Sequence, residues 1–227
     1  MKKSIFFLLA TCCALGFFSC NEPDDRVPLF NAFVTVHQRA IAGDYYFETD
    51  THKTIYPSDK SYLVDYVPRE GQRAFITFGL HDEKIENYDY NAIIYGLIDI
   101  YASEASIIAS KEELDELPDD PIIVDSKYSW LEGDWMTLRV YPIADIKKHT
   151  FHLFINDADP ADAELDYVNM ELRHDRGSDT EDTYYGDYIS FNLQAIRSRL
   201  EGKRGIKLRF KNDGGQSESI RFERASE

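Results

Sequence analysis

The sequence predicts an all-β protein in which a small barrel is followed by an antiparallel β-sandwich. Nearly every apolar run is short and repeats with a period of two residues, and Gly, Asp, Asn or Pro residues separate the runs. This period is typical of sheets, because successive side chains of a strand point to opposite faces. Stretches with the period of a helix are nearly absent, and Ala195–Gly202 is the one segment that we expect to form a short helix.

Residues 1–19 have the organisation of a signal peptide. Lys2 and Lys3 precede an apolar stretch over Ile5–Phe18, which ends at Ser19-Cys20. The stretch is shorter than the roughly 20 residues of a membrane-spanning helix. A small residue directly before a cysteine resembles the lipobox of bacterial lipoproteins, in which the cysteine is acylated and becomes the new N-terminus. An ordinary secretory signal that is cleaved elsewhere is the alternative.

Cysteine usage favours lipidation. The chain has 3 Cys, and Cys12 and Cys13 lie in the segment that would be removed. Cys20 is then the only thiol of the mature chain, so a disulfide within it is excluded, and acylation accounts for the unpaired cysteine. We therefore expect a palmitate-type anchor on Cys20 and an acidic tether over residues 20–28. The protein would be held at the outer membrane of the cell envelope, either in the periplasm or at the cell surface.

The chain is strongly acidic. It has 25 basic and 41 acidic residues, a net charge of −16, and cleavage before Cys20 would remove two bases and no acid. Nucleic-acid binding depends on a basic surface that neutralises phosphates, so nucleic acid is excluded as a partner.

Residues 29–110 are predicted to form the barrel. The Asn91–Tyr101 segment is apolar on both faces, which favours a strand that is central or curled inside a small barrel. About five strands in roughly 80 residues suit an OB-like barrel. We expect these strands over Leu29–His37, Tyr45–Thr49, Gln72–Leu80 and Asn91–Tyr101, with a short extended piece at Thr54–Tyr56.

A charged segment over residues 111–120, interrupted by Pro118, is the predicted linker, and it has room for a helical turn before Pro118. Alternation is cleaner in residues 121–227, where, for example, Met136 and Leu138 share one face and Arg139 lies on the other. Such alternation over many strands indicates sheets with one solvated face each, and hence a β-sandwich.

Five short motifs lie at residues 55–58, 71–74, 82–91, 172–175 and 188–193. Together they resemble the NigD-like lipoproteins of Bacteroidetes. The resemblance implies an N-terminal OB-like domain followed by a C-terminal β-sandwich, in agreement with the patterning. It supplies no established activity and no catalytic residues.

Motifs of known catalytic chemistry are not found. The chain has no nucleophile elbow, zinc-protease helix, dinucleotide fingerprint or phosphate-binding loop. His149 and His152 are three residues apart, a spacing that on a strand points them to opposite faces. We therefore predict no catalytic residue, no metal ligand and no cofactor.

The acidic segment 157–166 is the candidate calcium site that we weighed. It concentrates carboxylates but lacks the turn glycine and flanking helices of an EF-hand. In so acidic a chain we favour a solvated loop.

Four aromatic residues are candidate ligand contacts, namely Trp130, Trp135, Tyr184 and Tyr185. Exposed aromatic side chains bind sugars and protein partners, although packing in the core is the more common fate of large rings. Our leading hypothesis is a non-enzymatic, membrane-anchored binding or interaction module with a glycan or protein partner. The alternatives are a hydrolase that acts on glycan or envelope material through a carboxylate pair, and a calcium-dependent adhesin-like protein.

Overall fold

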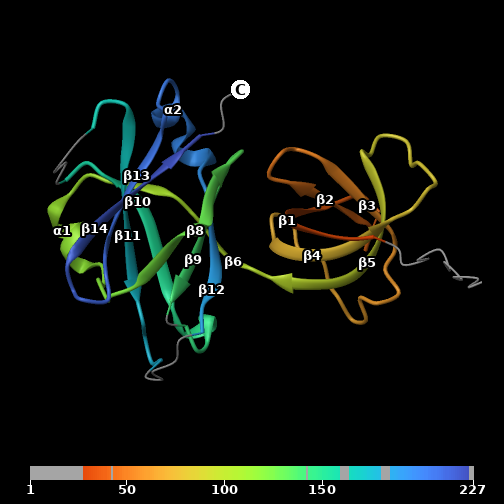
Figure 1. Cartoon of the computed structure of the whole chain (residues 1–227), viewed down its shortest axis with the longest axis horizontal. Coiled ribbons are helices and arrows are strands. Elements are labelled where there is room, and N and C mark those ends of the chain that lie inside the picture. The colour runs from red at the N-terminus through yellow and green to blue at the C-terminus, as the bar shows by residue number, and fades with distance from the viewer. Residues whose placement is uncertain (1–27, 42, 142, 159–163, 180–184, 225–227) are drawn as a thin grey trace, which may run out of the picture.

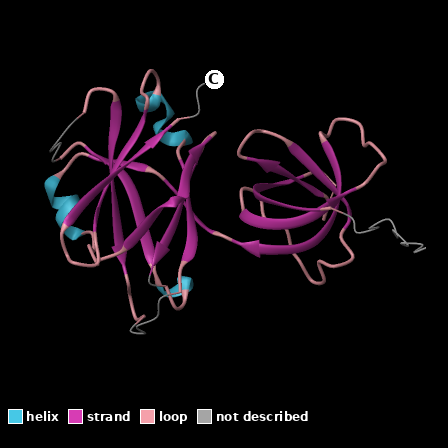
Figure 2. Ribbon diagram, viewed as in Figure 1, coloured by secondary structure: helices cyan, strands magenta, loops and turns pink. Residues whose placement is uncertain are grey.

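The computed structural model describes residues 28–41, 43–141, 143–158, 164–179 and 185–224. They form a closed barrel and a two-sheet sandwich that lie end to end along the long axis of the molecule (Figure 1). Strands dominate both parts, and the few helices lie at the margins of the sandwich (Figure 2). The predicted fold class is confirmed.

The barrel closes five strands in the order β1-β2-β3-β5-β4. Neighbours are antiparallel except for β3 and β5, which are parallel. Alternate residues point inward, and Val34, Phe47, Ile76 and Ile94 are among those with no more than 1% exposure. The strands are β1 (Leu29–Gln38), β2 (Tyr45–Thr49), β3 (Thr54–Asp59), β4 (Arg73–Leu80) and β5 (Tyr90–Asp99).

The sandwich packs a five-stranded sheet, ordered β14-β13-β11-β10-β7, on a four-stranded sheet, ordered β6-β12-β9-β8. Three pairs are parallel, namely β7 with β10, β11 with β13, and β6 with β12. The inward-facing apolar residues of both sheets form one core. The strands are β6 (Tyr101–Glu104), β7 (Ser106–Ile108), β8 (Ile123–Glu132), β9 (Trp135–Tyr141), β10 (Thr150–Asn156), β11 (Tyr167–Asp175), β12 (Asp187–Asn192), β13 (Gly205–Lys211) and β14 (Ser217–Glu223).

Short helices complete the sandwich. The expected helix near Ala195–Gly202 is present as a 3-10 turn, η2 (Gln194–Ile196), that continues into α2 (Arg197–Leu200). The other helices are α1 (Lys111–Glu116) and η1 (Ile146–Lys148).

The domain boundary differs from the expected one. Strands β6 and β7 lie within the expected barrel range of 29–110, yet they pair with sandwich strands β12 and β10. Only Ile100 separates β5 from β6. The expected linker 111–120 contains α1, whose Leu114 is buried against Ile108 and Phe154 of the sandwich. The sequence conceals this boundary because β5 and β6 form one extended run with no turn residue between them.

The predicted signal peptide, Cys20 and all of the predicted tether except residue 28 lie outside the described residues. In the part of the chain that the structure does describe, we find no helix with the length and apolar character needed to cross a membrane.

Candidate binding site at the domain junction

The two domains meet around a buried ion pair that belongs to the barrel. Arg73, at the start of β4, is 1% exposed, and Asp50, just after β2, is 7% exposed. The Nη1 and Nη2 atoms of Arg73 lie 2.6 and 2.7 Å from Oδ1 and Oδ2 of Asp50. Among the described residues, Nη1 and Oδ1 have no other hydrogen-bonding group beside them. This two-pronged geometry suits the guanidinium fork, and each charge compensates the desolvation of the other.

The sandwich supplies the other contacts of the pair. The guanidinium lies 4.6 Å from the ring centre of Trp135. Its Nε donates to Oγ of Ser190 at 3.5 Å, and Nε1 of Trp130 donates to Oδ2 of Asp50 at 3.3 Å. Because polar groups of one domain depend on side chains of the other, the junction fixes how the domains sit against each other.

Aromatic rings surround the ion pair. Phe33 of β1 makes edge contacts with Trp130 at 4.8 Å and with Tyr188 at 5.0 Å between ring centres. The turn before Trp135 approaches the barrel backbone closely, since a Cβ on Gly133 would lie 2.3 Å from the carbonyl oxygen of Asp50.

Of the four predicted ligand-contact aromatics, the structure brings two together at this junction. Trp135 is 9% exposed and packs on Arg73, while Trp130 is half-buried against Phe33. Tyr185 is 79% exposed and precedes β12. Tyr184 lies outside the described residues. Contact of any of them with a ligand stays a prediction.

A polar cleft of about 200 Å³ opens beside the junction. Hydrogen-bonding side chains from both domains form its walls, and one indole ring contributes apolar surface. Such a mixture can orient a polar ligand. The barrel contributes Thr35, His37, Glu48, Thr49, Asp50 and His52, and the sandwich contributes Asp134, Trp135, Asn192 and Gln194.

Glu48 is the centre of the hydrogen bonding in this cleft. Its Oε1 lies 2.6 Å from Nδ1 of His52, and its Oε2 lies 3.4 Å from Nε2 of His37. The other ring nitrogen of His37, Nδ1, lies 3.0 Å from Oε1 of Glu70. Among the described residues, no cluster of three or more His, Cys, Asp or Glu is arranged to hold a metal ion.

A row of aromatic side chains runs across the outside of the barrel from this cleft. The strand register places His37 of β1 opposite Tyr46 of β2, and the β2–β3 pairing brings Tyr56 next to Tyr46. Tyr88, from the loop before β5, lies 5.6 Å from Tyr46 and 5.0 Å from Tyr56 between ring centres. We call Tyr46, Tyr56 and Tyr88 the tyrosine face. His37 links it to the cleft by stacking on Tyr46 at 5.0 Å.

The tyrosine face was not predicted from the sequence, although one signal was available. Tyr45, Tyr46 and Phe47 are consecutive in a short strand. Because neighbours in a strand point to opposite faces, Tyr46 had to point outward if the other two filled the core.

The two histidines that we considered as metal ligands do not pair with each other. His149 instead contacts His174, with 2.7 Å between Nδ1 and Nε2, and its Nε2 lies 2.8 Å from Oδ2 of Asp179. Both rings of the pair are buried within the sandwich. Burial, and then the neighbouring His149, lowers the pKa of His174 to about 4.

Residues 159–163 of the candidate calcium segment lie outside the described residues. On either side of them, Asp157 makes a two-pronged ion pair with Arg199 at 3.0 and 2.9 Å. Glu164 contacts Arg221 at 2.6 Å and Lys207 at 2.9 Å. Hydrogen bonds from Arg221 and Lys207 lower the pKa of Glu164 to about 2. Calcium binding by this segment stays an untested prediction.

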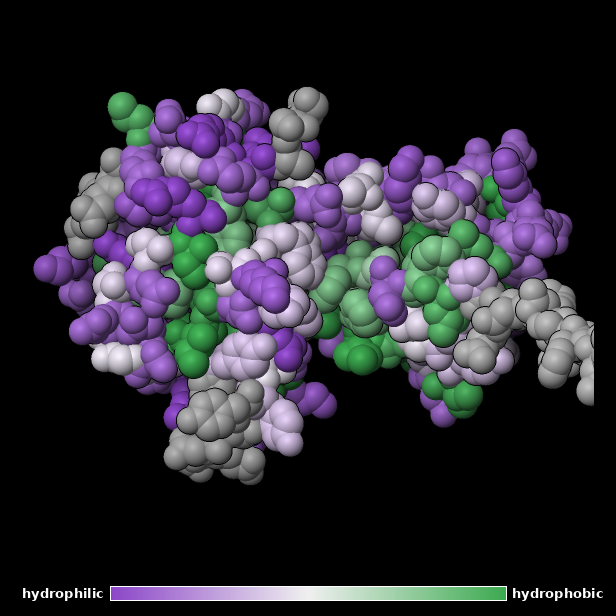
Figure 3. All heavy atoms as spheres, in the orientation of Figure 1, coloured by the Kyte–Doolittle hydropathy of each residue, from purple (hydrophilic) through white to green (hydrophobic). Residues whose placement is uncertain are grey.

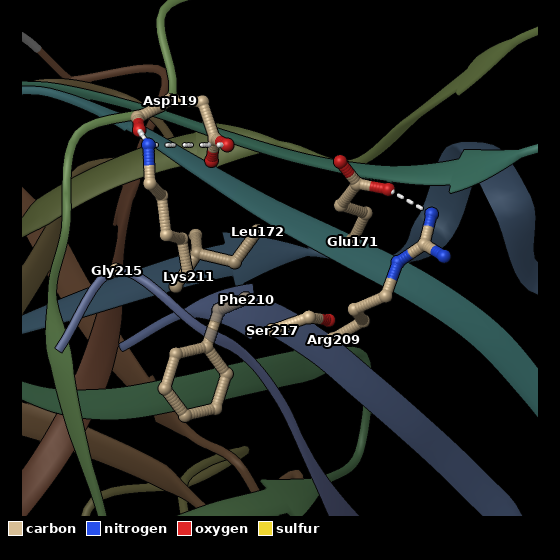
Figure 4. A pocket seen from close by; sticks show the side chains of 8 residues that line it. All are labelled: Asp119, Glu171, Leu172, Arg209, Phe210, Lys211, Gly215 and Ser217. Atoms are coloured by element: carbon tan, nitrogen blue, oxygen red, sulfur yellow. Dashed lines mark hydrogen bonds and ion pairs between the residues drawn. The ribbon is translucent and has the colours of Figure 1, made fainter. Parts of the chain in front are cut away.

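A second hollow, of about 230 Å³, lies on the outer surface of the five-stranded sheet. Figure 4 shows that its charged side chains face one another, Arg209 toward Glu171 and Lys211 toward Asp119. Burial raises the pKa of Glu171, but hydrogen bonds from Arg209, Arg173 and Asn156 outweigh it, and the net pKa is lowered. The sandwich and the segment that leads into it line this hollow alone, whereas the junction cleft has walls from both domains, so the junction cleft is the stronger candidate.

Comparison with known proteins follows the same two-domain division. Residues 33–100 match the family model of the NigD-like N-terminal OB domain, and residues 106–224 match that of the NigD-like C-terminal beta sandwich domain. No curated protein sequence matches the chain.

Solved structures with the same fold come from species of Bacteroides and Parabacteroides. A protein of unknown function from Bacteroides vulgatus is 17% identical, with a TM-score of 0.70, covering 88% of this chain and 92% of that one. A candidate lipoprotein from Bacteroides fragilis is 13% identical, with a TM-score of 0.64, over 88% and 99% of the two chains. A NigD-like immunity protein from Bacteroides caccae is 19% identical, with a TM-score of 0.55, over 86% and 91%. At such identities the likeness establishes the fold alone.

Proposed function

This chain belongs to the NigD-like family, and on that basis we propose that it is a lipid-anchored, non-enzymatic binding module of the cell envelope whose ligand occupies the junction cleft. The family resemblance of the sequence motifs is confirmed by the match of both domain models.

The observation that carries the proposal is the cleft with walls from both domains. The Arg73–Asp50 ion pair and the rings around it hold the two walls in one arrangement before any ligand arrives. A site that is already ordered loses little conformational entropy on binding, which favours affinity.

The carboxylates of the cleft support binding over hydrolysis. A glycosidase needs two carboxylates that flank the scissile bond, one of them to donate a proton. Here Asp50 is bound to Arg73, and Glu48 contacts His37 and His52. Asp134 lies 3.5 Å from a guanidinium nitrogen of Arg197. Each carboxylate therefore has a basic partner in place.

Anchoring through Cys20 is supported by the signal-peptide pattern and by the candidate lipoprotein among the structural neighbours. Strand β1 begins at Leu29, so the chain between Cys20 and the barrel is short. Fully extended, such a segment reaches about 30 Å. The barrel would thus stand close to the membrane, with the sandwich beyond it.

The proposal can be tested with one set of full-length variants in a bacterial host that acylates lipoproteins. Radiolabelled palmitate is expected to label the wild type and not Cys20→Ala. With Cys20 acylated, His52→Cys provides the only thiol that a maleimide-benzophenone can modify, at a side chain 61% exposed on the cleft rim. Illumination of cells carrying this variant is expected to give a covalent adduct of higher mass.

Asp213→Cys, in the exposed hairpin turn between β13 and β14, is the matched control and is expected to give no such adduct. Equal palmitate labelling of Cys20→Ala would refute the anchor. If His52→Cys and Asp213→Cys gave adducts in equal amounts, or if neither gave an adduct, a ligand in the cleft would be refuted.

A further inference from the structure

The tyrosine face lies where barrels of this type bind polymers. In OB folds, the face of strands 2 and 3 and the loops 1–2 and 4–5 contact oligonucleotides or oligosaccharides. Tyr46 and Tyr56 are on β2 and β3, Arg39 and Asp44 are in the loop between β1 and β2, and Tyr88 is in the loop between β4 and β5. The three rings are half-buried, so each presents part of its surface to solvent.

Polar groups border the rings closely. The guanidinium of Arg39 lies 6.0 Å from the ring centres of both Tyr56 and Tyr88, and its Nη1 lies 2.7 Å from Oδ2 of Asp44. The hydroxyl of Tyr56 donates to Oδ1 of Asp44 at 3.3 Å. Burial, and then the charge of Asp44, raises the pKa of Tyr56, so this phenol keeps its proton at neutral pH. The face therefore offers aromatic surface beside both donors and acceptors.

We propose that the tyrosine face and the adjoining junction cleft bind a neutral oligosaccharide, an inference that rests on the proposed function as a binding module. Sugar rings present C–H groups to aromatic faces and hydroxyls to the groups around them. The carboxylates, imidazoles and amides of the cleft continue this pattern, with His37 shared by the cleft and the aromatic row.

The charges of the border select against anionic polymers. Asp44, Glu48, Glu70 and Asp89 lie around the row, and the lysine and arginine nearby are already paired, Arg39 with Asp44 and Lys53 with Asp89 at 3.2 Å. Phosphates and uronates would meet a surplus of carboxylates. A chain with a net charge of −16 adds to that repulsion.

The composition of the face also disfavours a protein partner. The centre of a protein interface is depleted of charged residues. Asp44 accepts a hydrogen bond from the hydroxyl of Tyr56, and Arg39 borders the same ring. Most exposed aliphatic side chains of the barrel, among them Val64, Val67 and Ile98, belong to other segments, whereas Ile41 lies in the loop that carries Arg39 and Asp44. In Figure 3 apolar side chains gather over part of the barrel and in a band over the middle of the sandwich, with polar side chains around both.

The dimensions favour a chain of sugars over a single one. Neighbouring strands lie about 4.8 Å apart, so the row of rings from β3 to β1 spans about 10 Å. The cleft continues the row beyond β1. We therefore expect affinity to increase from the monosaccharide to the hexasaccharide.

The experiment uses detergent-solubilised full-length protein and isothermal titration calorimetry. The probes are cellohexaose, maltohexaose, xylohexaose, mannohexaose and chitohexaose, the parent monosaccharides, hexagalacturonate and a single-stranded DNA oligonucleotide. At least one neutral hexasaccharide is expected to bind, and hexagalacturonate and DNA at least tenfold more weakly. Tyr46→Ala and Tyr56→Ala are each expected to lower the affinity at least tenfold.

Tyr62→Ala is the matched control, because Tyr62 is a 60% exposed barrel tyrosine that contacts Tyr95 and lies outside the face. It is expected to bind like the wild type, and thermal melting of all three variants checks their folding. The inference is overturned if no neutral hexasaccharide binds, if DNA or hexagalacturonate binds as well, or if Tyr62→Ala is as weak as Tyr46→Ala. A protein adduct at His52→Cys together with no glycan binding would overturn this inference and leave the proposed function standing.

Discussion

Arg73 is a single residue on which both the barrel and the junction depend. Its side chain is fully buried, and among the described residues Asp50 is the one carboxylate that pairs with it. Trp135 covers the flat surface of the guanidinium. A buried charge that loses its partner cannot be rehydrated without disturbing the packing around it. The ion pair therefore acts as one unit.

Removing one member of this pair should be far more harmful than removing both. Arg73→Met is expected to lower the free energy of unfolding by about 3–5 kcal/mol, because Asp50 stays buried without compensation. The double variant Arg73→Met/Asp50→Leu should recover most of that loss. Arg69→Met breaks an ion pair whose side chains are 70% and 53% exposed and should cost at most about 1 kcal/mol. Denaturant unfolding measures the free energy of unfolding of all three variants. If Arg73→Met were as stable as the wild type, the expected role of the pair would be contradicted.

The buried histidine pair gives the sandwich a pH dependence. Nδ1 of His174 donates to the carbonyl oxygen of Pro121 at 3.3 Å, and its Nε2 faces Nδ1 of His149 at 2.7 Å. The other ring nitrogen of His149, Nε2, lies 2.8 Å from Oδ2 of Asp179. A second proton on His174 would be buried beside another imidazole. This is why burial and His149 hold the pKa of His174 at about 4.

A histidine whose pKa is lower in the folded state stabilises the fold fully above its unfolded pKa of about 6.5 and loses that contribution as the pH falls. We expect the free energy of unfolding to decrease between pH 6.5 and 4, by about 3 kcal/mol from His174. His174→Phe removes this titration and should show a smaller decrease in denaturant unfolding at the same pH values. Parallel pH curves for wild type and variant would rule the assignment out.

At the scale of the elements, turns fix the relation between the domains as much as strands do. Gly133 lies between β8 and β9 with φ at +57°, and its Cα faces the carbonyl of Asp50 in the barrel. A side chain there would be strained by the backbone conformation and would also collide with the other domain.

Gly133→Ala is therefore expected to destabilise the chain by more than the roughly 1–2 kcal/mol of the left-handed conformation alone. Gly71→Ala is the matched comparison, because Gly71 has φ at +73° and nothing within 4 Å of an added Cβ. Thermal and denaturant unfolding of the two variants separate the collision from the strain. If Gly133→Ala and Gly71→Ala lower the free energy of unfolding equally, the close approach of Gly133 to Asp50 adds nothing to the cost of the left-handed conformation.

Strand positions were predictable because apolar alternation is a local property. Tyr45–Thr49 was expected and observed with the same bounds, and the sandwich strands follow the alternation of residues such as Met136 and Leu138. Strand direction was not predictable in this way, since a parallel pair such as β11 and β13 alternates just as an antiparallel pair does. The domain boundary was missed for a related reason, as β5 and β6 read as one strand.

At the scale of the whole molecule, the candidate site depends on long-range pairing that composition and period do not encode. His37, Tyr56 and Tyr88 are far apart in the chain, and only barrel closure places them in one row with Tyr46. From the sequence, Trp130 and Trp135 were two of four candidate ligand-contact aromatics, with no indication of what they would contact. Their contacts with Arg73 and Asp50 come from the packing of one domain on the other.

The passage from β5 to β6 through Ile100 has a mechanical meaning. Strands β1 and β5 are both antiparallel to β4, so they point in the same direction, and the start of β1 and the end of β5 lie at opposite ends of the barrel. In a protein held at its N-terminus, a pull on the sandwich would load the β1–β4 and β4–β5 hydrogen bonds in shear, all together instead of one by one. With only Ile100 between the domains there is no slack to absorb the force. Under the proposed anchoring through Cys20, the barrel would therefore carry tension between the membrane and the sandwich.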